Sequence, residues 1–225
     1  MNSNPILDHA KQVQALQVRL AELAMQVPMP PEAAPDRHHI GYQEFGLAFH
    51  HALSIVSLVN HHETELAASA FALVRPMYET LQRGWWFTLC ASDAQAARLI
   101  DDDAFVGGSL TQVAAAIDVQ PPFQNTEFFS RFAQEEWNLY HSFTHGGRAA
   151  LAVYGHRPNL DPDFDPGTIV ALLDNAARMS AVAALGMCWV CGHYEPARVD
   201  PIYRQVVAIA PDLDLARPSP PAAGT

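Results

Sequence analysis

Apolar residues recur along this chain every three or four positions, and polar residues fill most of the positions between them. This spacing matches the 3.6-residue turn of an α-helix. A half-buried strand would instead alternate apolar and polar residues, and no sustained stretch of the chain does so. The sequence therefore predicts an all-α protein: a helical bundle of four to five long helices with short connecting helices.

Proline, glycine and capping residues divide this pattern into segments. Pro76 should kink or break one of the long helices, because proline lacks the N–H that a helix interior uses. Ser92 with Gln95 and Ser109 with Gln112 have the spacing of a capping box, so each pair should open a short helix. We expect long helices over residues 5–27, 41–60, 63–91, 126–144 and 166–192, and short ones over 92–101, 109–119 and 200–209.

The breaks also predict how the chain is organised. Residues 1–27 should form an N-terminal helix, and residues 28–40 should form a Pro-rich linker that begins with PMPPEAAP. Residues 41–210 are expected to form the helical bundle domain. Residues 211–225, rich in Pro and Ala, are expected to form a disordered tail.

Composition and charge narrow the class of protein. The formal net charge is −11 and Lys11 is the only lysine, which argues against broad, non-specific binding to nucleic acid but leaves room for a local arginine cleft. The start of the chain lacks the pattern of a secretory signal, and three cysteines suggest reduced thiols. The most apolar stretch, residues 167–192, contains Asp174 and Arg178, so we expect a buried core helix. We therefore expect a cytoplasmic protein with no membrane partner.

The stretch LYHSFTHGG, residues 139–147, contains the most suggestive histidines of the chain. Gly146 and Gly147 should end the helix there. On a helical wheel, Phe129, Phe132, Leu139, Tyr140 and Phe143 form one apolar side. The opposite sector is polar, with His141 at its edge, and contains Arg131, Glu135, Asn138, Ser142 and His145. This polar stripe is either a solvated surface or one wall of an inward-facing site.

A second polar stripe lies on the predicted helix over residues 63–91. Arg75, Glu79 and Arg83 are four residues apart and therefore stack on one side of the helix. His145 falls in the last turn of its own helix, where the partial negative charge of the carbonyl end favours a cationic side chain. Such a histidine can donate a proton or bind a phosphate, or it can simply contact the last carbonyl groups. If both stripes face each other, Arg75, Glu79 and His145 form a polar cleft.

Three stretches together, RPMYETLQRGWW, CASDAQAARLIDDD and LYHSFTHGG, resemble a family of uncharacterised bacterial all-helical proteins. Members share an Arg-x-x-x-Glu helix and a later helix that ends in Ser/Thr-x-x-His-Gly. The resemblance covers residues 67–147, which are 81 of 225 positions. The family in turn looks distantly similar to the HEPN superfamily, helical bundles that are common in toxin–antitoxin and phage-defence systems and include many ribonucleases.

The resemblance implies a site and an activity. Arg75, Glu79 and His145 match the shared motifs and are the candidate catalytic residues. The expected ligand is RNA or a nucleotide, and the implied enzyme is a metal-independent ribonuclease that needs no cofactor and acts as a homodimer. Active HEPN proteins carry a histidine four to six residues after an arginine, a spacing that no arginine has here. The neighbouring polar residues are candidate ligand-binding residues: Arg83, Arg131, Asn138, Ser142 and His141.

Two other functions remain open. The chain can be a non-catalytic module that binds a partner protein through its long apolar helix. It can also be a DinB-like, metal-dependent four-helix-bundle enzyme in which His50 or His61 joins His141 and His145, since three imidazoles suffice for an open zinc or nickel site. The CWVC stretch, residues 188–191, lies near the end of an apolar helix rather than at its start, so we expect buried core thiols.

Overall fold

A computed structural model describes residues 4–62, 65–124, 126–135, 137–154 and 163–211, and within these ranges all regular structure is helical, with no strand. The predicted all-α class is confirmed. The helices are α1 (Pro5–Ala24), α2 (Asp36–His62), α3 (Ala67–Ala72), α4 (Val74–Leu89), α5 (Asp93–Asp102), α6 (Leu110–Asp118), α7 (Phe128–Glu135), α8 (Trp137–Thr144), α9 (Arg148–Ala152), α10 (Pro166–Gly192) and α11 (Pro196–Ile209).

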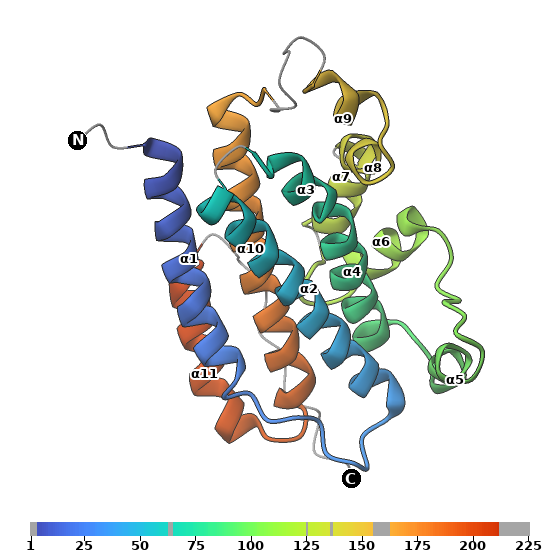
Figure 1. The fold of residues 1–225 in the computed structure, drawn as a ribbon. Coiled ribbons are helices and arrows are strands. Elements are labelled where there is room, and N and C mark those ends of the chain that lie inside the picture. The colour runs from blue at the N-terminus through green and yellow to red at the C-terminus, as the bar shows by residue number, and fades with distance from the viewer. Residues whose placement is uncertain (1–3, 63–64, 125, 136, 155–162, 212–225) are drawn as a thin grey trace.

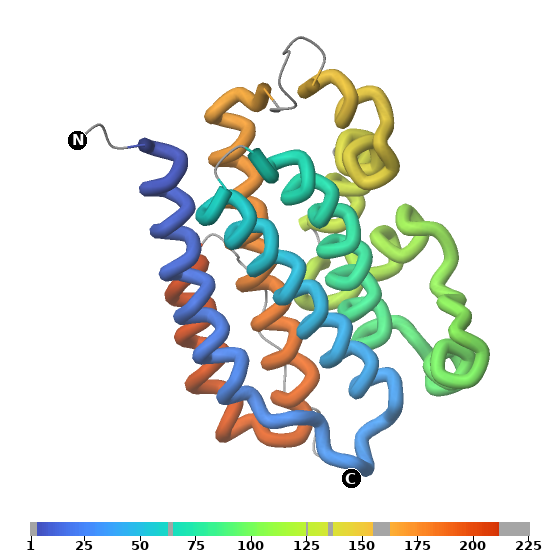
Figure 2. The backbone as a smooth tube through the Cα atoms, viewed as in Figure 1, coloured from blue at the N-terminus to red at the C-terminus, as the bar shows by residue number. Residues whose placement is uncertain are grey.

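Helices α2, α4 and α10 form the centre of the bundle. Helix α2 packs against both α4 and α10, and α10 also packs against α1 and α11 (Figure 1). Helix α6 packs on α4, while α8 packs on α3, so α5 to α9 lie on the side of the bundle away from α1 and α11 (Figure 2). The core is therefore shared by helices from both halves of the chain.

Close packing at the centre depends on an aromatic ring that lies between two glycines. Phe45 of α2 is fully buried. A Cβ atom added at Gly84 of α4 would lie 2.7 Å from its ring, and one added at Gly186 of α10 would lie 2.5 Å from it. Any larger side chain at either glycine would push α2 away. Trp85 also packs against the Phe45 ring in a T-shaped contact, with 5.1 Å between the ring centroids.

Most local signals predicted helix boundaries correctly. Both capping boxes form, with the hydroxyl of Ser92 accepting from the Gln95 backbone N–H and that of Ser109 from Gln112. Helix α10 begins at Pro166 and ends at Gly192, as predicted. The predicted break at Pro76 is confirmed, because α3 ends before it and α4 begins at Val74.

Several boundaries and one orientation differ from the predictions. Helix α2 begins at Asp36, within the predicted linker, because the acidic first turn directly after Pro35 can already form a helix start. Helix α11 begins at Pro196 rather than near residue 200, and α9 was not predicted. The predicted helix over residues 126–144 is described as α7 and α8, and residue 136 and the predicted tail from 212 onwards lie outside the described residues. Leu139 is 45% exposed, so its predicted place on the apolar side is wrong.

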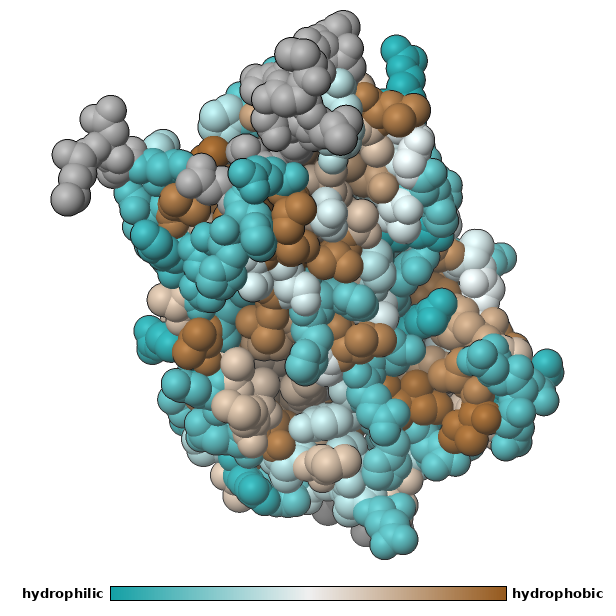
Figure 3. Space-filling model, viewed as in Figure 1, coloured by the Kyte–Doolittle hydropathy of each residue, from teal (hydrophilic) through white to brown (hydrophobic). Residues whose placement is uncertain are grey.

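Helix α10 is long and apolar enough to cross a membrane by length and composition alone. However, 67% of its most apolar window is buried inside the protein, against α1, α2, α4 and α11. The face of the molecule in Figure 3 mixes hydrophilic and hydrophobic side chains and has no continuous apolar band. The prediction that this helix is a buried core helix is confirmed, and such burial is typical of a soluble protein.

Candidate functional site

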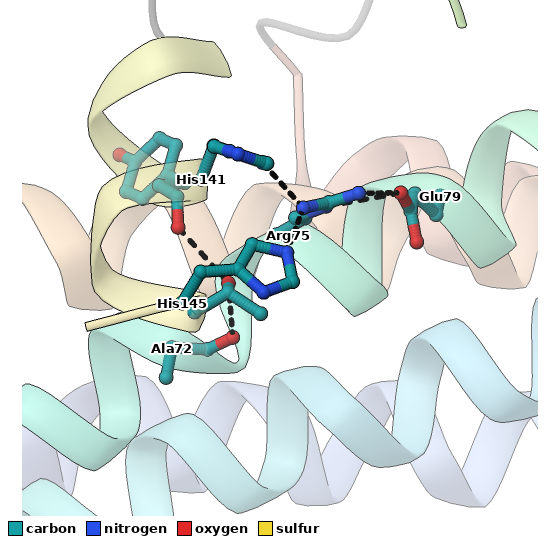
Figure 4. A network of polar contacts seen from close by, with 7 residues as sticks. Ala72, Arg75, Glu79, His141 and His145 are labelled. Atoms are coloured by element: carbon teal, nitrogen blue, oxygen red, sulfur yellow. Dashed lines mark hydrogen bonds and ion pairs between the residues drawn. The ribbon is translucent and has the colours of Figure 1, made fainter. Parts of the chain in front are cut away.

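Four side chains, two from α4, one from α8 and one from the turn directly after α8, meet near the start of α4. We call Arg75, Glu79, His141 and His145 the Arg–His cluster (Figure 4). Arg75 Nε and Nη2 donate to Glu79 Oε1 at 3.1 and 3.0 Å. The remaining nitrogen, Arg75 Nη1, contacts His141 Nδ1 at 2.5 Å and also contacts His145 Nε2. The structure thus brings the three candidate catalytic residues together across 70 positions of sequence.

Hydrogen-bond chemistry determines the protonation pattern of this cluster. A guanidinium group can only donate, so both imidazole nitrogens that face Arg75 must accept. Each ring is then neutral, with its proton on the other nitrogen: Nε2 in His141 and Nδ1 in His145. The cluster is therefore one cation with a carboxylate on one edge and two neutral imidazoles on the other.

Pro76 determines how α8 is attached beside Arg75. Because proline has no N–H, the carbonyl four residues earlier, that of Ala72, loses its helical partner. The hydroxyl of Thr144, in the last turn of α8, shares its one hydrogen between this carbonyl at 3.2 Å and the Tyr140 carbonyl at 2.9 Å. The break predicted from Pro76 thus provides the acceptor that holds α8, and its histidines, next to the start of α4.

The end of α8 is shaped by the two glycines. Gly146 adopts a left-handed conformation with φ of 65°, and the N–H of Gly147 donates to the Ser142 carbonyl at 2.7 Å, the 6→1 bond of a Schellman motif. The hydroxyl of Ser142 accepts from the Ala149 N–H at 2.9 Å. Ser142, predicted as a ligand-binding residue, therefore uses its hydroxyl to hold the turn into α9.

Aromatic side chains support the cluster from behind. Phe71 of α3 stacks on Phe143 and Tyr140 of α8, which fixes the two helices together. The guanidinium carbon of Arg75 lies 4.8 Å from the ring centroid of Trp137, within cation–π range. The side chain of Arg75 is only 20% exposed, whereas both histidines are exposed. The arginine is therefore held rigidly, and the imidazoles form the open side of the cluster.

The remaining candidate residues lie apart from the cluster. Arg131 is exposed and lines a separate hollow beside Asp118. Asn138 is exposed on α8. Arg83 lies two turns beyond Arg75 on α4, with its guanidinium 4.9 Å from the ring centroid of Phe105. His141, which the wheel placed at the edge of the polar sector, contacts Arg75 directly.

Two buried polar side chains near the arginines, Gln82 and Glu44, were not among the candidates predicted from the sequence. Gln82 is 1% exposed, and within the described part of the chain neither polar atom of its amide has a hydrogen-bond partner. Glu44 Oε2 on α2 is also buried with no partner among these residues. Burial raises the pKa of Glu44 to about 7, although the positive charge of Arg83 opposes the shift. Glu79, Thr80 and Arg83 surround Gln82 in the sequence, so no local pattern marked its amide as buried.

The proposed metal ligands do not gather in one place. Among the described residues, no group of three or more His, Cys, Asp or Glu side chains is placed to hold a metal ion. His50 and His61 are exposed on α2, while the other two histidines contact Arg75.

The thiols of the CWVC stretch are buried, as expected. The Cys191 thiol donates to the Pro28 carbonyl at 2.8 Å. Burial raises the pKa of Cys188 and of Cys191 to about 12, so both remain as unreactive thiols.

Comparison with known proteins identifies a family but no activity. A model of a family of unknown function, DUF6988, matches residues 45–211. No curated protein and no solved structure matches the chain. The matched range includes the whole Arg–His cluster and Gln82, whereas α1 and Glu44 lie outside it.

Proposed function

The chain belongs to the DUF6988 family, whose function is unknown, and we propose that it is a HEPN-like protein that binds a phosphate group of RNA or of a nucleotide at the Arg–His cluster. The observation that supports this most is the convergence of three nitrogen atoms: Arg75 Nη1, His141 Nδ1 and His145 Nε2. A carboxylate holds Arg75 in place, and a guanidinium group is well suited to bind phosphate once Nη1 exchanges its imidazole partners for phosphate oxygens.

Binding would exchange one set of hydrogen bonds for another. In the free protein, Arg75 Nη1 donates to two neutral imidazoles. A phosphate oxygen placed between them would accept from Arg75, and each imidazole that takes up a proton would become a second charged donor. Glu79 would keep the guanidinium oriented through Nε and Nη2, while partly offsetting its charge. We therefore expect moderate affinity and strong dependence on Arg75.

The paired imidazoles favour a second function, cleavage of RNA without a metal. Their ring centroids are 4.5 Å apart, so both can contact one phosphodiester. One imidazole would take the proton of the 2′-hydroxyl as its oxygen attacks phosphorus, and the other, protonated, would give its proton to the departing 5′-oxygen. Arg75 would stabilise the charge on the phosphate oxygens. The products would be a 2′,3′-cyclic phosphate and a 5′-hydroxyl end.

A binding experiment with a charge-matched control tests the first function. Fluorescence anisotropy with single-stranded RNA at low salt should show at least a tenfold loss of affinity, about 1.4 kcal/mol, in Arg75→Gln. Arg131→Gln removes an equal charge from a separate hollow and should leave affinity within about twofold. Equal weakening by the two substitutions would show that only overall charge matters. Absence of RNA and nucleotide binding would support the protein-interaction alternative.

Cleavage is tested with the same RNA in the presence of EDTA. His145→Ala should lower the rate at least about a hundredfold, in line with the usual contribution of general acid–base groups. His62→Ala, which changes an exposed histidine at the end of α2, should have no effect. Loss of activity on adding EDTA would instead support the metal-dependent alternative. The proposed setting is cytoplasmic, as a homodimer in a defence or toxin–antitoxin system.

A further inference from the structure

A small cavity lies directly beside the Arg–His cluster, further along α4. Its volume is about 150 Å³. Glu79, Gln82 and Arg83 form the wall from α4, and the opposite wall is apolar, formed by Phe105, Leu110 and Val113. This is well above the ~10–15 Å³ that a single water needs, so the cavity can accept a group of several heavy atoms, such as a single-ring base.

Gln82 is one of the residues that line this cavity, and its amide is buried without a partner among the described residues. Its side chain is 1% exposed, and among the described residues neither Nε2 nor Oε1 forms a hydrogen bond. A buried amide left in this state costs about 1–3 kcal/mol, and an apolar side chain of similar shape would avoid that cost. An amide kept at such a cost in a cavity wall is explained if a ligand completes its hydrogen bonds.

We propose that the cavity binds the base of a nucleotide whose phosphate is bound at the Arg–His cluster; this inference rests on the proposed function. A glutamine amide places a donor and an acceptor side by side, which matches the donor–acceptor edge of a nucleobase. Phe105 provides a flat aromatic wall, and bases stack on such rings whatever their sequence. Arg83, 4.9 Å from the centroid of that ring, adds a cation at the same wall.

The two sites are continuous. Glu79 belongs to both sites, because its carboxylate accepts from Arg75 and the residue also lines the cavity. Residues 75 and 82 are seven positions apart, about 10 Å along the helix axis at 1.5 Å per residue. That distance is of the order of the length of one nucleotide, so phosphate and base can occupy both sites at once.

Calorimetry on the full chain separates the two sites. The probes are ribose 5-phosphate, which has no base, and the four ribonucleoside 5′-monophosphates. At least one nucleotide should bind tenfold or more tightly than ribose 5-phosphate. Gln82→Met should remove most of that difference while leaving the affinity for ribose 5-phosphate unchanged. This variant should fold, because it replaces an unpartnered amide by an apolar side chain of similar length.

Arg75→Gln distinguishes failure of the proposed phosphate site from failure of the proposed base site. It should weaken ribose 5-phosphate and nucleotides by a similar factor, because both share the phosphate site. If all nucleotides bind no more tightly than ribose 5-phosphate, or if Gln82→Met leaves their advantage intact, the cavity holds only water and the inference is overturned while the proposed function stands. If Arg75→Gln leaves every affinity unchanged, the proposed function itself fails and the inference fails with it.

Discussion

A buried carboxyl group next to Arg83 should contribute a stability that falls as the pH rises. Burial raises the pKa of Glu44 from its ordinary value of 4.5 to about 7. Between these two values the folded protein holds a proton that the unfolded chain has released. The free energy of unfolding therefore decreases as the pH rises through this interval, and the stabilisation of the neutral acid is lost above about pH 7.

The magnitude follows from the same two values. A difference of one unit between the pKa values of the folded and unfolded states corresponds to about 1.4 kcal/mol. The interval from 4.5 to about 7 therefore gives an upper limit of about 3 kcal/mol. Glu44 is not completely buried, and solvent screening reduces this figure. We expect Glu44→Gln, which keeps the shape but cannot ionise, to stabilise the protein at pH 8 by about 1–2 kcal/mol.

Urea unfolding of wild type and Glu44→Gln at several pH values measures this difference directly. The difference should be small at pH 4.5, grow towards pH 7 and then level off. Glu32→Gln, which changes an exposed glutamate, is the matched control and should give a flat, near-zero difference. A stabilisation of Glu44→Gln that does not vary with pH would refute the reasoning, because it would show that Glu44 stays charged in the folded protein.

Three further changes test the packing. Gly84→Ala should lower the free energy of unfolding, measured in urea, by about 1–3 kcal/mol, because the alanine methyl group would lie 2.7 Å from the ring of Phe45. A stabilised variant would mean that α2 can shift freely. Thr144→Val should cost about 0.5–1.5 kcal/mol, because it removes the hydroxyl shared by the Ala72 and Tyr140 carbonyls, and should weaken RNA binding. Unchanged binding would show that the contact with Ala72 does not position α8. Burial lowers the pKa of His38 from 6.5 to about 4, so the contribution of the neutral ring to stability is lost as the pH falls from 6.5 towards 4. In thermal unfolding, the stability of wild type relative to His38→Gln should therefore fall over this interval, and a constant difference would contradict the prediction.

The sequence alone determined the secondary structure and the fold class, because these depend on interactions between residues close in the chain. Hydrogen bonds in a helix join positions four apart, so capping boxes, glycines and prolines act within one turn of where they stand. The capping box at Ser92, the start of α10 at Pro166 and the left-handed Gly146 could therefore all be predicted. The start of α2 was missed because an acidic residue after Pro35 is a weak signal beside three prolines.

Only the tertiary structure decided which polar residues meet. The sequence identified Arg75, Glu79 and His145 as candidates, but the contact between Arg75 and His145 joins residues 70 positions apart. The helical wheel placed Leu139 on the apolar side, although it is 45% exposed, and gave His141 only an edge position, although it contacts Arg75.

Burial of polar side chains was likewise decided by tertiary packing. Gln82 and Glu44 each have a polar neighbour in the sequence, and only the packing of the described helices shows that Gln82 Nε2 and Oε1 and Glu44 Oε2 are buried there without partners. Whether a polar atom is buried depends on neighbours from other helices, which helical periodicity cannot specify. The local chain thus determined the helices and their ends, and the packing between distant helices determined the Arg–His cluster and the cavity beside it.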